Sequence, residues 1–135
     1  MGYENDLQRS EAMVAIILGL LLERGIRSDG VSFRDLKAET ELQSFFVPCM
    51  RWLKAESLIR YTTEKEYGHD KGVVFFDPCL TSRGFAVMGD KFVIANRDIS
   101  VGQAVKEISK DGASFSRLGD FFGGVLGGFT KSMGS

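Results

Sequence analysis

Residues 32–88 constrain the fold most strongly, because helical and extended patterns follow one another there at short distances. Ser32 and Asp35 have the spacing of a capping pair, in which each side chain satisfies an amide at a helix start. They predict a short helix from Phe33 to Glu39. A second helix, two strands and the start of a further helix come next. This order predicts a mainly helical α+β domain.

Pro48 determines where the second helix of this stretch begins. A proline removes a hydrogen bond inside a helix, but it is tolerated in the first turn, where the amide has no helical partner. We therefore expect the helix to begin between Ser44 and Val47 and to run to Glu56. Its inward residues are expected to be Phe46, Met50 and Leu53.

A hairpin is predicted after this helix. Leu58 to Tyr61 opens the first strand, and Val73 to Phe76 forms the second. The stretch from Glu64 to Gly72 between them is polar and contains glycine, which is typical of a turn. The sequence thus predicts two antiparallel strands joined by a charged turn.

An apolar helix is predicted before this stretch. Ser10 is expected to cap its start, Gly25 is expected to end it, and Ser28-Asp29-Gly30 is expected to form a turn. Apolar residues at helical spacing are Met13, Ile16, Ile17, Leu20 and Leu21. Because Val14, Ala15 and Leu18 widen this apolar face, we expect the helix to be buried on more than one side.

Two motifs resemble those of a known protein family. One is Leu53-Lys54-Ala55-Glu56-Ser57-Leu58-Ile59-Arg60 and the other is Leu80-Thr81-Ser82-Arg83-Gly84. The first is similar to the end of the recognition helix in MarR-like and PadR-like winged-helix regulators, with Ser57 where that family usually has glycine. The second is similar to the segment by which those regulators leave the wing, and here Thr81 can cap the next helix while Gly84 lets that helix pack closely.

The resemblance covers about residues 10–90 and implies a winged helix-turn-helix with a two-stranded wing. It also implies a transcription-regulator-like protein that binds DNA as a homodimer. We therefore divide the chain into a winged-helix domain, residues 1–90, and a C-terminal arm, residues 91–135, which is expected to be helical.

The charge balance limits how such a domain could bind DNA. The 135 residues contain 17 Lys and Arg against 18 Asp and Glu, so no large basic field exists. Residues 1–90 hold 11 basic and 14 acidic side chains, a net charge of −3, and residues 91–135 hold 6 and 4, a net charge of +2. Any contact with a duplex would need a few cations gathered on one face.

Candidate DNA-contacting residues lie on the second helix of the stretch and on the hairpin. The candidates for phosphate contacts are Arg51, Lys54, Arg60, Lys65, His69 and Lys71. Gln43 and Ser44 could reach base edges from the helix start. The alternative is that these are ordinary solvated side chains, since Glu56, Glu64, Glu66 and Asp70 lie among them.

The sequence predicts neither an enzyme nor a cofactor. No catalytic partner stands at motif spacing from His69, which is interpreted as a surface residue of the charged turn. The glycine pairs near the C-terminus follow no strand and precede no Lys-Ser/Thr pair, so they do not form a phosphate-binding loop. Cys49 and Cys79 have no metal-ligand spacing and are interpreted as small buried side chains of a reduced, cytoplasmic protein.

Aromatic residues on the second helix suggest a protein interface as the rival function. Phe45 and Trp52, with Pro48 between them, would form an aromatic ridge if exposed, and aromatic residues are enriched at protein–protein interfaces. The alternative is that the C-terminal helices cover them. In the rival reading, the winged helix is an interaction module that does not bind DNA.

The C-terminal arm carries a second candidate interface. Its apolar residues at helical spacing are Leu118, Phe121, Phe122, Val125, Leu126 and Phe129. Interspersed glycines make a helix there unstable unless another surface covers it. We expect this arm and the first helix to form a homodimer interface. Peripheral membrane association through the arm is a lesser alternative, because Arg117 and Lys131 are few cations to hold an anionic surface.

Overall fold

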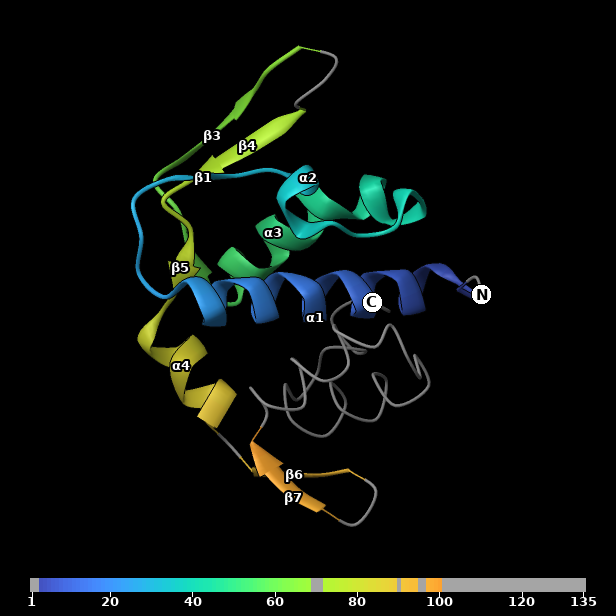
Figure 1. The fold of residues 1–135 in the computed structure, drawn as a ribbon, viewed down its shortest axis with the longest axis vertical. Helices are drawn as coiled ribbons and strands as arrows, with labels where there is room; N and C mark the ends of the chain where they lie inside the picture. Colours follow the sequence, from blue (N-terminus) through green and yellow to red (C-terminus); the bar gives the residue numbers. More distant parts are fainter. Residues whose placement is uncertain (1–2, 69–71, 90, 95–96, 101–135) are drawn as a thin grey trace.

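The computed structural model describes residues 3–68, 72–89, 91–94 and 97–100 (Figure 1). They form an α+β structure in which a long helix packs against a helical layer and small antiparallel sheets (Figure 1). The predicted residues His69, Lys71 and the apolar residues of the arm from Leu118 to Phe129 lie outside the described residues.

The long helix α1 spans Asp6–Arg24. Its cap is Asn5, whose side-chain oxygen accepts a hydrogen bond from the Gln8 amide at 2.9 Å. The prediction that Ser10 caps this helix was therefore wrong. Ser10 is buried inside the helix, and its hydroxyl donates to the Asp6 carbonyl at 2.9 Å. The hydroxyl is thus hydrogen-bonded within the helix and does not cap it.

The helix α1 is buried on more than one side, as its wide apolar face predicted. Every residue from Ser10 to Ala15 is buried, and this run is longer than one helical turn, so α1 has no exposed side there. The predicted end at Gly25 is confirmed, because Gly25 has a φ of 67° and its amide donates to the Leu21 carbonyl at 3.1 Å.

The next helices differ from prediction in length. The capping pair is confirmed, since the Ser32 amide donates to Asp35 Oδ2 at 2.7 Å. However, α2 spans only Phe33–Leu36, because Lys37 adopts a left-handed conformation with a φ of 54°. A short 3₁₀ helix, η1, follows at Thr40–Phe45 and was not predicted.

The helix α3 spans Phe46–Ala55, so Pro48 lies in its first turn as expected. The three predicted inward residues are buried: Phe46, Met50 and Leu53. Just after the helix, Ser57 has a φ of 64°, and the Leu58 amide donates back to the Leu53 carbonyl at 3.0 Å. This pattern is a Schellman motif, which satisfies carbonyls at the end of a helix.

The strands form two sheets in this part of the chain. The larger sheet has the order β1–β4–β3, from β1 (Gly30–Val31), β4 (Val73–Phe76) and β3 (Thr63–Glu66), all antiparallel. The smaller sheet pairs β2 (Ile59–Arg60) with β5 (Cys79–Leu80).

Two strand predictions were therefore wrong in detail. Leu58 to Tyr61 does not open the hairpin, because Ile59 and Arg60 pair with β5 and the first hairpin strand starts at Thr63. Gly30, expected in a turn, is instead paired with Phe76 as part of β1.

Phe75 of β4 joins the sheet to the helices. It is fully buried, and its ring packs edge-on against Phe46 of α3 and Tyr61, at centroid distances of 5.4 Å and 4.8 Å. Such edge-on pairs are a favoured aromatic geometry. Phe75 thereby fixes the hairpin against α3, so the exposed residues of the two elements lie side by side.

The chain continues through α4, at Ser82–Gly89, into an unexpected hairpin. The strands β6 (Lys91–Ile94) and β7 (Arg97–Ser100) pair antiparallel. The expectation of a wholly helical arm over residues 91–135 was thus wrong for residues 91–100. These strands are rich in β-branched residues, which favour extended structure.

Candidate nucleic-acid interface

Arg51 of α3 is paired with Glu64 of β3. Its Nε donates to Glu64 Oε1 at 3.1 Å and to Oε2 at 3.4 Å, and its Nη2 also donates to Oε1. The register of the hairpin explains why Glu64 reaches α3. Glu64 lies directly opposite Phe75, and opposite residues of an antiparallel pair point to the same face, here the face that packs on α3.

Tyr61 and Lys54 complete a cluster around this carboxylate. The Tyr61 hydroxyl donates to Glu64 Oε2 at 3.2 Å, and Lys54 Nζ lies 4.4 Å from the centroid of the Tyr61 ring. We call these four residues, Arg51, Lys54, Tyr61 and Glu64, the Glu64 cluster. It gathers two cations and one hydroxyl donor around one carboxylate, at the junction of α3 and the hairpin.

The protonation of the cluster follows from these contacts. The hydrogen bond from Arg51 holds the pKa of Glu64 below its usual value. The same contact raises the pKa of Arg51. Burial raises the pKa of Tyr61, and the Glu64 charge adds to that effect. At neutral pH, Glu64 is therefore ionised and the Tyr61 hydroxyl keeps its proton to donate.

The remaining described DNA candidates are exposed but are not part of this cluster. Gln43 and Ser44 lie in η1, one element before the helix start where they were expected. Arg60 is exposed on β2. Lys65 follows Glu64 on β3, so it points to the opposite face of the sheet, and its Nζ lies 5.8 Å from the Tyr67 ring centroid. Among the predicted cations, Arg51 and Lys54 are thus joined through the contacts of the Glu64 cluster.

The two aromatic residues predicted for a protein interface have an intermediate environment. Phe45 and Trp52 are half-buried and pack partly against the core, whereas Pro48 is exposed. They are neither a fully exposed ridge nor completely covered. The rest of that predicted interface, from Leu118 to Phe129, lies outside the described residues.

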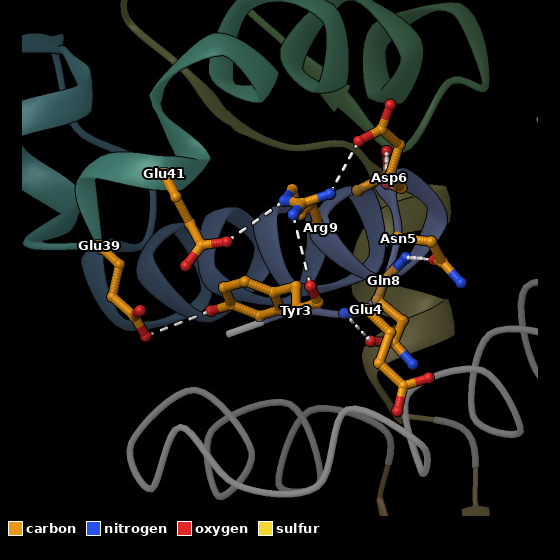
Figure 2. Close-up of polar contacts among 9 residues, drawn as sticks. Tyr3, Glu4, Asn5, Asp6, Gln8, Arg9, Glu39 and Glu41 are labelled. Carbon is orange, nitrogen blue, oxygen red and sulfur yellow. Dashed lines mark hydrogen bonds and ion pairs between the residues drawn. The ribbon is translucent and has the colours of Figure 1, made fainter. Parts of the chain in front are cut away.

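A second polar cluster was not anticipated from the sequence. Figure 2 shows Arg9 of α1 between Asp6, at 2.9 Å, and Glu41 of η1, at 3.3 Å. Beside it, the Tyr3 hydroxyl donates to Glu39 at 3.4 Å (Figure 2). Burial, together with the charges of Glu39 and Glu41, raises the pKa of Tyr3 to about 12. These contacts attach the start of α1 to η1 and leave this end of the molecule acidic.

The sequence gives only weak signals for the roles of Glu64, Tyr3 and Arg9. Glu64 was noted only as one of several acids among the candidate cations, because its pairing with Arg51 depends on the register of a hairpin. Tyr3 and Arg9 precede the apolar run of α1 and have no motif spacing. In the described ranges, no three His, Cys, Asp or Glu side chains gather as a metal site, and no helix is long and apolar enough to cross a membrane.

Comparisons with protein-family models, curated proteins and solved structures gave no match to this chain.

Proposed function

We propose that residues 10–90 form a winged helix-turn-helix domain that binds duplex DNA, with α3 as the recognition helix and the β3–β4 hairpin as the wing. The order α1, β1, α2, α3, β3, β4 supports this proposal, as does the pairing of β1 with β4 beside the hairpin (Figure 1). The two motifs that resemble those of winged-helix regulators lie where α3 ends and where α4 begins.

The observation that carries the proposal is the position of Arg51 and Lys54. Both are exposed, and they lie three residues apart on α3, a spacing that places two side chains on one helix face. That face adjoins β3 of the hairpin through the Arg51–Glu64 pair. Cations on a helix beside a hairpin can contact successive backbone phosphates of a duplex, which fixes the orientation of the protein without reading sequence.

A random DNA duplex tests this proposal. Binding followed by fluorescence anisotropy at low salt should be weakened by Lys54→Ala. Arg83→Ala is the matched control, because it removes one positive charge from α4, which lies on the other side of α1 from the β3–β4 hairpin (Figure 1). Equal losses in the two variants would mean that only net charge matters, and would contradict a site at α3.

The second candidate function is a protein-interaction module. It is favoured by the net charge of −3 over residues 1–90 and by the partly exposed Phe45 and Trp52 beside exposed Pro48. A duplex would be repelled by such a charge unless the cations of α3 dominate locally. The absence of duplex binding at tens of micromolar protein, at low salt, would favour this second function.

The homodimer through the first helix and the arm stays a prediction. Met13, Ile17 and Leu21 of α1 are buried within the single chain. A second copy that contacts α1 would therefore meet its half-buried residues instead, such as Ile16 and Leu20. Sedimentation of the full chain, compared with Leu20→Asp, tests this contact. We also propose a cytoplasmic location, with which two free, buried cysteines are compatible.

A further inference from the structure

The Glu64 carboxylate is held by donors of a kind that also bind phosphate. It accepts hydrogen bonds from Arg51 and from the Tyr61 hydroxyl, and Lys54 lies over the Tyr61 ring. The guanidinium fork of arginine binds carboxylates and phosphates with the same planar geometry. The contacts that hold Glu64 are therefore those that would hold a phosphodiester oxygen.

A phosphate and Glu64 cannot use these donors at the same time. Both Nε and Nη2 of Arg51 are directed at Glu64, so Arg51 must leave that carboxylate before it can grip a phosphate in the same way. The pair is accessible to an external anion, because the Arg51 side chain is 61% exposed and that of Glu64 is 28% exposed. Solvent screens such a pair, whereas a duplex offers many phosphates and releases counterions when it binds.

We propose that Glu64 is an intramolecular competitor for a phosphate site formed by Arg51, Tyr61 and Lys54. In the free protein, Glu64 occupies this site. A backbone phosphate of a duplex displaces it on binding, and Arg51 changes partner. A ligand therefore binds at this site only if it binds these donors more strongly than Glu64 does. Binding of isolated anions is weakened for this reason. This inference rests on the proposed DNA-binding function.

Glu66 provides a matched control for Glu64. The two residues lie on the same strand, two positions apart, and therefore on the same face. Glu66 is exposed and forms no ion pair within the described residues. Glu64→Gln and Glu66→Gln change the net charge equally, so any long-range attraction of the duplex should rise by a similar amount in both variants.

The experiment compares the affinities of these two variants and the unmodified protein for one random duplex, by fluorescence anisotropy at low salt. We expect Glu64→Gln to bind about twofold to fivefold more tightly than Glu66→Gln, the range that one exposed ion pair supports. In an Arg51→Ala background, this difference should disappear, because the competition acts through Arg51. Circular dichroism would verify the fold. If Glu64→Gln does not fold, Glu64→Thr repeats the comparison, because threonine is favoured in β-strands.

Failure of the competitor role can be distinguished from failure of the DNA-binding proposal. Duplex binding with equal affinities for Glu64→Gln and Glu66→Gln would overturn the competitor role and leave the DNA-binding proposal standing. A difference that persists without Arg51 would also overturn it. If neither the unmodified protein nor Glu64→Gln binds the duplex, both proposals fail. Binding by Glu64→Gln alone would support both.

Discussion

Ser57 holds a backbone conformation that costs free energy in the native chain. Its φ of 64° lies in the left-handed region, where a side chain is disfavoured by about 1–2 kcal/mol relative to glycine. The greater freedom of glycine in the unfolded chain offsets part of that gain. We expect Ser57→Gly to stabilise the protein by about 0.5–1 kcal/mol in urea unfolding. Ser28→Gly, in an exposed loop without positive φ, should give no gain. A loss of stability in Ser57→Gly would contradict this account.

Gly84 allows α4 to approach the chain at Leu58. A Cβ added at Gly84 would overlap the Leu58 carbonyl oxygen, which is backbone and cannot turn aside. We expect Gly84→Ala to destabilise the fold by about 1–3 kcal/mol, the usual effect of overpacking. The control is Gly89→Ala at the other end of α4, where a Cβ would meet nothing within 4 Å. Similar melting temperatures for the two variants would show that this close approach is not required.

At the scale of whole elements, the sequence predicted those that carry strong end signals. Pro48 placed the start of α3, Gly25 the end of α1, and Thr81 the cap of α4, where its Oγ1 accepts from the Gly84 amide at 3.0 Å. It did not predict β1 or the pairing of β2 with β5. Strands of two residues have no periodicity to read, and their existence depends on partners distant in sequence.

The candidate site was predictable only in part, for the same reason. Arg51 and Lys54 could be assigned to one helix from local sequence alone. The position of Glu64 depends on which residue of β3 lies opposite Phe75, and a shift of one residue would have turned Glu64 to the other face and Lys65 toward α3. Local residue patterns did not determine that register.

The attachment of α1 to η1 should make stability depend on alkaline pH. The pKa of Tyr3 is raised to about 12 from its ordinary value of 10, so the folded state favours the protonated hydroxyl. This contribution is fully present below pH 10 and is lost as the pH rises toward 12. Tyr3→Phe keeps the ring but removes the titrating group. We therefore expect its melting temperature to fall less than that of the unmodified protein between pH 10 and 11.5, a window set by this pKa shift. Parallel declines would contradict the role of Tyr3.

Across the whole molecule, one group of acidic residues lies apart from the candidate site. The acidic residues around Arg9 lie at the N-terminal end of α1, away from the β3–β4 hairpin (Figure 1). Arg51 and Lys54 lie beside the hairpin. These acidic residues thus lie outside the surface proposed to meet a duplex, whereas Glu64 and Glu66 of β3 lie on it.

The salt dependence of duplex binding shows whether Arg51 and Lys54 contact phosphates. Each phosphate contact that is lost reduces the slope of log affinity against log salt by about 0.9. We predict that Arg51→Ala combined with Lys54→Ala lowers the slope by about 1.8, while Arg83→Ala leaves it unchanged. An unchanged slope in the double variant, or no binding at low salt by either the unmodified protein or Glu64→Gln, would contradict a DNA-binding site on α3.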